Sequence, residues 1–266
     1  MPIILVVILL GIVEGVTEFL PVSSTGHLIL ANALLGYDPE TWKVFNVVIQ
    51  LGAMMAVVVL YWRTFMAVAV GLLRREPGAI AFVRNILIAF MPVAIIGLLI
   101  HDQIEAMLGS AELVSVALIV GGIAILIIEK TVKEGDIASV SAIPWQKALA
   151  IGGFQCLSMV PGVSRSGATI LGALSIGVER RTAAEFSFFL ALPTMAGATA
   201  LELYKNHDQL GTVGLPLIGL GMLVSFLVAL VVIKAFLAIV TKRGFGPFAW
   251  YRILVGGAAL VWLTAG

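Results

Sequence analysis

Charged side chains are scarce in this sequence. Only 12% of its 266 residues are Asp, Glu, Lys or Arg, whereas a typical soluble domain has about 25%. The formal net charge is +1, so nothing indicates a nucleic-acid-binding surface, and we expect no nucleic-acid partner. A single cysteine, Cys156, excludes an intrachain disulfide and a CxxC metal site.

The beginning of the chain also lacks a basic segment and a small-residue cleavage site. We therefore expect no cleaved signal peptide and expect the first apolar segment to remain in the mature protein. What the sequence has instead is apolar surface: 61% of the residues are hydrophobic and the mean hydropathy is +1.11. This composition, together with long apolar runs, predicts a protein that lies in a bilayer.

Six apolar segments are long enough to cross a hydrocarbon core of about 30 Å. They are residues 45–62, 86–100, 113–128, 183–203, 215–240 and 248–264. Two other apolar regions, 3–35 and 145–176, are interrupted by clusters of Pro, Gly and hydroxyl residues. Irregular backbone at membrane depth requires a protein or water environment for its polar groups. We therefore predict two re-entrant helix–loop–helix hairpins; the alternative is two ordinary spans, each broken by a short polar loop.

The chain also resembles itself. Residues 11–60 align without a gap with residues 152–201. The identical pairs include Gly11/Gly152, Ser23/Ser164, Gly26/Gly167, Gly36/Gly177, Thr41/Thr182, Phe45/Phe186 and Met54/Met195. This predicts a duplication, with repeats at about 1–133 and about 142–266, inside one membrane domain that covers residues 1–266. Because three full spans separate the aligned segments, we expect an inverted-topology repeat whose two hairpin tips meet near the midplane.

Basic residues gather on one side of the predicted spans. They are Arg63, Arg74, Arg75, Arg84, Lys130, Lys133, Lys147, Arg180, Arg181, Lys242 and Arg243. The loops on the other side, 37–44, 101–112 and 204–214, contain only Lys43 and Lys205. Because Lys and Arg favour cytoplasmic loops, we expect the larger set inside the cell and both termini outside. The fold class is thus an all-α polytopic membrane protein with six transmembrane helices and two re-entrant hairpins.

Glu14 and Glu18 are four residues apart on a predicted helix, so both carboxylates lie on one face. Carboxylates in an apolar segment are costly, which indicates a function such as binding a hard cation, sharing a proton or pairing with a base. We expect this pair to be catalytic and to bind a divalent cation, Mg²⁺ or Ca²⁺. The alternatives are a protonated pair or a salt bridge to Arg165.

Three hydroxyls and a histidine follow Pro21 directly: Ser23, Ser24, Thr25 and His27. Hydroxyls in membrane helices often bond only their own backbone. Beside a histidine and a carboxylate pair, however, they favour a site in which Ser24 attacks with His27 as base, or in which His27 itself attacks phosphorus. We expect Ser23 and Thr25 to bind substrate.

Arg165 carries a permanent charge in the middle of the second interrupted region. A guanidinium at that depth needs an anionic partner, and its fork matches phosphate oxygens. Glycine-rich backbone and a following helix N-terminus favour the same ligand. The neighbouring residues expected to bind substrate are Gly162, Ser164, Ser166, Gly167 and Thr169. In the alternative interpretation, Arg165 merely neutralises Glu14 or Glu18.

Two motifs carry a resemblance to a known family. An (E/Q)xxxE motif is present as Glu14–Glu18 and continues as FLPVSSTGH to His27, and a PGxSRSxxT motif is intact from Pro161 to Thr169. The chain resembles the bacterial undecaprenyl-diphosphate phosphatase family, also known for bacitracin resistance. The resemblance implies the fold of six spans and two hairpins, dependence on a divalent cation, and removal of the terminal phosphate of undecaprenyl diphosphate. The product is the carrier lipid for peptidoglycan synthesis, recycled at the outer face of the cytoplasmic membrane.

We therefore expect a polyprenyl diphosphate whose tail lies in a groove open to lipid while its diphosphate reaches the site from outside. The alternative is a secondary transporter or flippase for a phosphate-bearing lipid or a small anion, since inverted repeats and broken helices are typical of transporters. The residues do not decide whether Ser24, His27 or a water is the nucleophile. They also leave the oligomeric state open, with a homodimer as one alternative.

Overall fold

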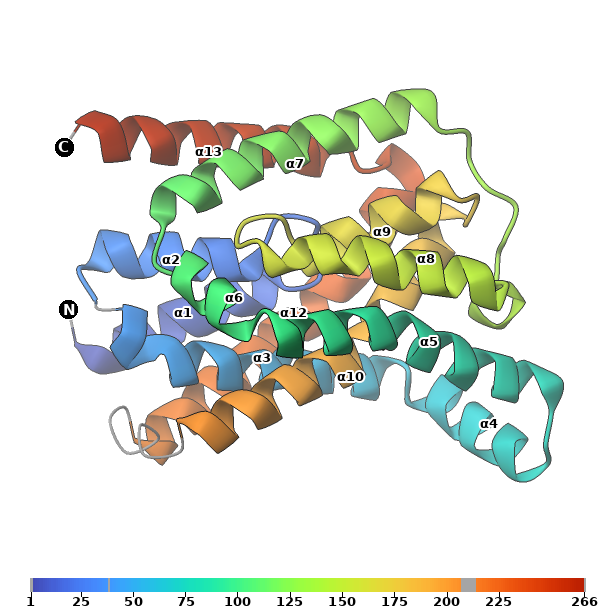
Figure 1. Ribbon diagram of the computed structural model, residues 1–266. Coiled ribbons are helices and arrows are strands. Elements are labelled where there is room, and N and C mark those ends of the chain that lie inside the picture. Colours follow the sequence, from blue (N-terminus) through green and yellow to red (C-terminus); the bar gives the residue numbers. More distant parts are fainter. Residues whose placement is uncertain (1, 38, 207–213, 266) are drawn as a thin grey trace.

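The computed structural model describes residues 2–37, 39–206 and 214–265, and this part of the chain is helical (Figure 1). The α-helices are α1 (Ile3–Thr17), α2 (Ser24–Leu35), α3 (Pro39–Leu60), α4 (Trp62–Leu73), α5 (Pro77–Leu99), α6 (His101–Met107), α7 (Ala111–Thr131), α8 (Trp145–Gln155), α9 (Arg165–Ser175), α10 (Arg180–Lys205), α12 (Leu215–Arg243) and α13 (Gly246–Ala265). Short 3₁₀ helices occupy Val140–Ala142 and Cys156–Met159.

Among the described residues, six helices are long and apolar enough to cross a membrane. They are α3, α5, α7, α10, α12 and α13. The six spans predicted from hydropathy are thus confirmed; α5 begins nine residues before its predicted start, and the other ends differ by a few residues. The short helices α4 and α6 were not predicted; they lie in the connections before and after α5.

The two interrupted regions form helix–loop–helix pairs. α1 and α2 contain 15 and 12 residues, and α8 and α9 contain 11 each, so each helix is shorter than the roughly 20 residues of a full span. In Figure 1, α1 and α2 lie in the left half of the molecule and α8 and α9 in the right half. Their loops touch, because the Ser166 hydroxyl donates a 2.7 Å hydrogen bond to the Leu20 carbonyl.

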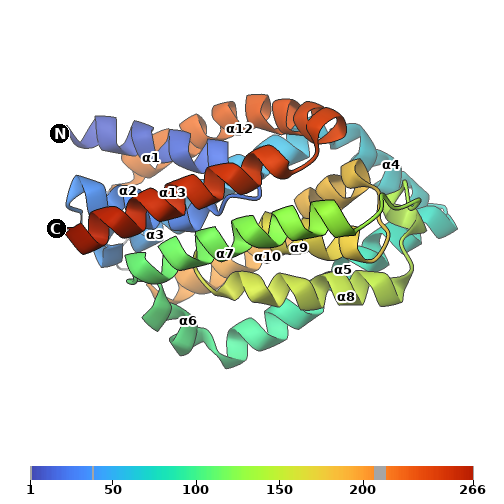
Figure 2. The same ribbon diagram turned by 90° about the horizontal axis from the view of Figure 1, so that it is seen from above.

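Glycines permit close contact between these pairs and the spans. A Cβ added to Gly11 would lie 2.9 Å from the Gly221 carbonyl oxygen, and one added to Gly15 would lie 2.6 Å from that of Ser225. Only glycine fits against α12 at such distances, which is the small-residue packing that membrane helices use. Gly122 has the same role between α7 and α13, which run side by side in Figures 1 and 2.

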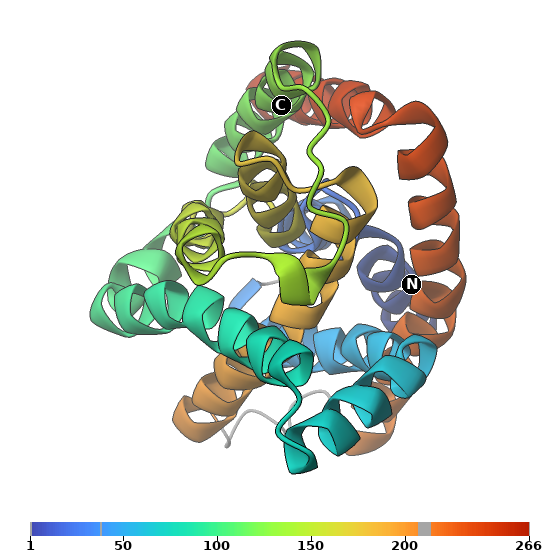
Figure 3. The same ribbon diagram turned by 90° about the vertical axis from the view of Figure 1, so that its right-hand side faces the viewer.

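Both termini lie at one end of the molecule (Figures 1 and 2). The segments that join α3 to α5, α7 to α8, α9 to α10 and α12 to α13 lie at the other end, and these connections and the helix ends beside them carry the predicted basic set. Seen along the helices in Figure 3, α2 and α9 lie near the centre while α7, α13 and α12 curve around them. The two loops are therefore enclosed by spans.

Candidate active site

The helices that follow the two loops begin in the same way. Ser23 has φ 70° and caps α2 by accepting a 3.2 Å hydrogen bond from the Gly26 N–H. Ser164 has φ 81° and caps α9 by accepting a 3.0 Å bond from the Gly167 N–H. Left-handed backbone is rare and costly for residues other than glycine, and it concentrates at functional sites. Both helix N-termini start at the meeting point of the loops, where they favour an anion.

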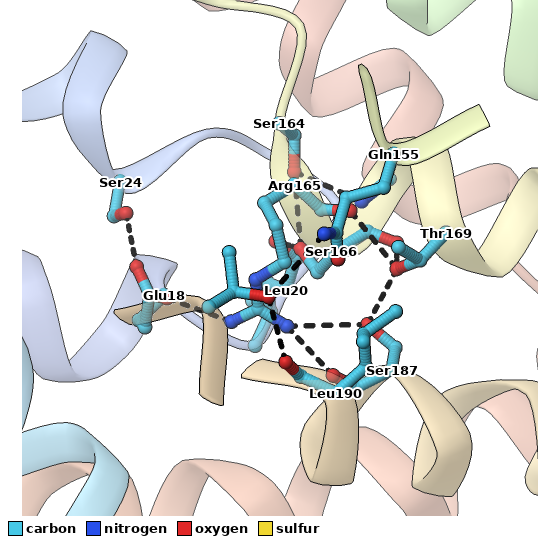
Figure 4. A network of polar contacts seen from close by, with 12 residues as sticks. Glu18, Leu20, Ser24, Gln155, Ser164, Arg165, Ser166, Thr169, Ser187 and Leu190 are labelled. Atoms are coloured by element: carbon cyan, nitrogen blue, oxygen red, sulfur yellow. Dashed lines mark hydrogen bonds and ion pairs between the residues drawn. The ribbon is translucent and has the colours of Figure 1, made fainter. Parts of the chain in front are cut away.

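A carboxylate joins the two helix pairs at this point (Figure 4). Arg165 Nη2 donates a 2.7 Å bond to Glu18 Oε1, and the Ser24 hydroxyl donates to Glu18 Oε2. The ion pair is buried, with side-chain exposures of 8% for Arg165 and 4% for Glu18. Glu18 therefore holds a hydroxyl from one loop and a guanidinium from the other.

The opposite side of the Arg165 guanidinium is held by α10. Arg165 Nη1 donates hydrogen bonds to the Ser187 carbonyl at 2.9 Å and to the Ser187 hydroxyl at 3.3 Å. The Thr169 hydroxyl donates a 2.7 Å bond to the Ser187 hydroxyl and so steadies that contact (Figure 4). Arg165 Nε is buried and has no partner in the described part of the chain. The two terminal nitrogens of the guanidinium are thus held in place, while the Nε–H donor has no partner among the described residues.

Glu18, Ser24 and Arg165 line a cavity of about 410 Å³. The predicted site residues on its wall are Glu18, Ser23, Ser24, Thr25, Gly162, Ser164 and Arg165. Much of the remaining wall is apolar and comes from α5 and α10, including Phe90, Val93, Leu98, Met195 and Leu201. The cavity thus combines a polar base with an apolar side.

The end of the cavity near the termini is polar and charged. Lys43 at the start of α3 donates to Glu105 on α6 and lies 3.4 Å from Glu202 on α10; all three line the cavity, as does His101. The hydrogen bond from Lys43 lowers the pKa of Glu105. These ion pairs link three helices at this end of the cavity; the sequence analysis had named none of the three as a site residue.

Glu14 and His27 lie behind the cavity wall. Glu14 is fully buried, and neither of its carboxylate oxygens has a hydrogen-bond partner among the described residues. His27 Nδ1 lies 2.8 Å from the Ser23 carbonyl oxygen and Nε2 lies 2.9 Å from the Tyr251 hydroxyl. Where the chain is described, no hydrogen bond joins His27 to Ser24, so the role of His27 as base stays a prediction.

Two further predicted residues, Ser166 and Thr169, form hydrogen bonds within the protein and do not line the cavity. Ser166 bonds Ser164 at 3.0 Å and the Leu20 carbonyl, and Thr169 bonds the Arg165 carbonyl at 2.9 Å as well as Ser187. They hold the loops and Arg165, while their predicted contact with substrate stays a prediction. The pairing of Arg165 with Glu18 is the arrangement that the alternative interpretation of Arg165 anticipated.

Glu14 and Glu18 offer the right atoms for a divalent cation. Their ligand atoms are carboxylate oxygens, which Mg²⁺ and Ca²⁺ prefer. The two Glu14 oxygens are buried without a partner, and an uncompensated buried carboxylate is costly. The donor set therefore fits such an ion.

Comparison with known proteins decides the family. The model of the bacitracin resistance protein BacA family matches residues 7–258. The chain belongs to this family.

Three curated relatives of this BacA-family chain carry the same name. An undecaprenyl-diphosphatase of Novosphingobium aromaticivorans is 62% identical over 265 residues, which cover 98% of both chains. Those of Sphingopyxis alaskensis and Rhizorhabdus wittichii are 59% and 57% identical and cover 97% and 98% of both chains.

One buried cation of this BacA-family chain was missed by the sequence interpretation. Arg252 on α13 is 1% exposed and, within the described part of the chain, donates only to backbone carbonyls. The signal was present, because an arginine inside an otherwise apolar span needs a partner. Ser187 was also missed; in the internal alignment it lies opposite Asn46, another polar residue in a span.

Proposed function

We propose that this protein hydrolyses undecaprenyl diphosphate to undecaprenyl phosphate and inorganic phosphate, and so recycles the carrier lipid for cell-wall synthesis. The observation that carries the proposal is the buried set of Glu18, Ser24 and Arg165 at the base of a cavity with an apolar side. The set offers a nucleophile, a proton acceptor and a phosphate-binding cation. Full-length relatives named undecaprenyl-diphosphatase support the same reaction.

In this mechanism Arg165, with the N-termini of α2 and α9, binds the diphosphate and stabilises the charge that develops on the transferred phosphoryl group. The Ser24 oxygen attacks the terminal phosphorus while Glu18, its hydrogen-bond partner, takes the proton. The bond from phosphorus to the bridging oxygen breaks, and the polyprenyl monophosphate leaves. Water then cleaves the phosphoserine, which releases inorganic phosphate and restores Ser24. Direct attack by water is the simpler variant, and attack by His27 needs a change of its present bonds.

A divalent cation, Mg²⁺ or Ca²⁺, is part of the proposal. Glu14 and Glu18 would hold it, since the Glu14 oxygens have no other partner among the described groups. When bound, the ion neutralises charge on the diphosphate. Release of phosphate should then stop on addition of EDTA and return with added Mg²⁺ or Ca²⁺.

We also propose how the chain lies in the membrane. It forms six spans and two re-entrant hairpins, which are related as inverted repeats of about 1–133 and about 142–266. The matching serine caps at Ser23 and Ser164, which align in the repeat, support it. The basic helix ends lie opposite the end that carries the termini and the part of the cavity wall formed by Lys43, Glu105 and Glu202. With basic ends in the cytoplasm, the site of this inner-membrane protein opens to the outer face. A homodimer stays a prediction.

Phosphate release from a long-chain prenyl diphosphate by purified protein in detergent tests the function. We expect release by the wild type and by Arg74→Ala, whose arginine is exposed, and loss of release in Arg165→Ala. No release by folded wild type across prenyl lengths and divalent metals would overturn the hydrolase and leave the transporter alternative, which the relatives' names do not support.

A further inference from the structure

Arg252 makes an unusual set of contacts for a charged residue. Its guanidinium donates to the carbonyls of Pro21 and Gly162 at 2.9 Å each, and to that of Val163 at 2.9 Å. On α7 it donates to Ala117 at 3.1 Å and to Leu118 at 3.2 Å. All five donor hydrogens of an arginine can be used in such an arrangement. No described carboxylate forms an ion pair with it.

The contacts join the two loops at matching positions. Pro21 lies two residues before Ser23, and Gly162 lies two residues before Ser164; the internal alignment pairs Pro21 with Gly162. Both serines have a positive φ and cap a helix. The helix after Ser23 carries Ser24, and the helix after Ser164 carries Arg165. The N–H and C=O of a trans peptide point in opposite directions. By holding the Val163 carbonyl, Arg252 therefore turns the next N–H, that of Ser164, away from itself.

We infer that Arg252 is a positioning residue for the phosphatase reaction: it fixes the two loops relative to each other and thereby sets the geometry of Ser24, Glu18 and Arg165. This inference rests on the proposed function. Arg252 does not line the cavity, so it acts through the loops and does not touch the phosphate. A shift of about 1 Å in such a site can lower the rate about 100-fold.

The structure makes a specific space for this side chain. A Cβ added to Gly121 on α7 would lie 1.9 Å from Arg252 Nη2 and 2.5 Å from its Cζ. Gly121→Ala therefore displaces the guanidinium while every residue of the loops stays the same. Gly257 on the Arg252 helix has no neighbour within 4 Å of an added Cβ, which makes Gly257→Ala a matched control.

The test compares Arg252→Lys, Gly121→Ala and Gly257→Ala with wild type by kcat and KM for a prenyl diphosphate, normalised to the monodisperse folded protein in detergent. Lysine keeps the charge but has three donor hydrogens where arginine has five, so it cannot hold the carbonyls of both loops and of α7 together. We expect Arg252→Lys and Gly121→Ala each to lower kcat about 10- to 100-fold with KM little changed, and Gly257→Ala to match wild type.

Unchanged kcat per folded molecule in Arg252→Lys or Gly121→Ala would overturn the inference, because a purely structural arginine alters only the yield of folded protein. If Arg252→Lys does not fold, Gly121→Ala decides alone. A wild type that is folded but inactive would instead refute the proposed function, so the two failures are distinguishable.

Discussion

Replacing Arg165 with alanine leaves the Glu18 carboxylate buried without its cation. The side chains of this pair are 8% and 4% exposed, so the Glu18 carboxylate depends on the guanidinium more than on solvent for its stabilisation. Breaking a buried pair by removing one partner costs about 3–5 kcal/mol, and we expect Arg165→Ala to lose stability of this size. Adding Glu18→Gln removes the orphaned charge, so the double variant should regain most of it. Phosphate release should nevertheless stay absent in both, because both lack Arg165, which binds the phosphate.

The free energy of unfolding can be measured by titrating the purified protein from mild detergent into sodium dodecyl sulfate, with phosphate release assayed on the same samples. Arg74→Ala, which removes an exposed arginine, is the control for loss of a positive charge. A double variant no more stable than Arg165→Ala would show that Glu18 is not the group left uncompensated. Recovery of activity together with stability would show that Arg165 serves the fold and not the reaction.

Three further outcomes follow from other parts of the chain. Ser24→Ala should lower kcat at least about 100-fold because it removes the attacking oxygen, whereas Thr25→Ala should weaken substrate binding more than kcat; steady-state phosphate release separates the two, and near-normal kcat in Ser24→Ala would favour attack by water. Gly15→Val should lower the thermal midpoint in detergent, because its side chain would collide with the backbone of α12; an unchanged midpoint would contradict that close contact. The hydrogen bond from Lys43 lowers the pKa of Glu105, so its stabilising effect is complete above the ordinary value of 4.5 and is lost as pH falls through the lowered pKa; Glu105→Gln should remove this acid-dependent part of a midpoint-against-pH curve, and identical curves would refute it.

The spans could be predicted from the sequence because hydrocarbon thickness sets a length and a composition that few other structures share. The helices α4 and α6 could not, since segments of 12 and 7 residues have neither the length nor the charge pattern that separates a helix from a loop. Gly11 and Gly15 were readable as a close contact, because a four-residue spacing of glycines has few other uses in a membrane helix.

From the sequence, Glu18, Ser24 and Arg165 could be predicted to share one site. Which of them form hydrogen bonds or ion pairs with one another could not be predicted. A carboxylate and a phosphate present similar oxygens to a guanidinium, so ion pairing with Glu18 and binding of substrate predict the same neighbours for Arg165. His27 is three residues from Ser24 on the same helix, yet its ring nitrogens lie beside the Ser23 carbonyl and the hydroxyl of Tyr251 on α13, and residue spacing shows no partner from a distant helix. Arg252 was missed because its partners are carbonyls, which every residue has.

The apolar side of the cavity has a consequence for how the enzyme distinguishes substrates by head group and by tail length. A volume of about 410 Å³ holds the head group and only the first part of a long prenyl tail, and the wall there belongs to α5 and α10, helices that also face lipid. In the proposed mode of binding, the rest of the tail would be surrounded by hydrocarbon before and after binding, so it would add little to the binding free energy. Tail length then determines how much substrate the bilayer retains at the enzyme, while the head group determines what is cleaved.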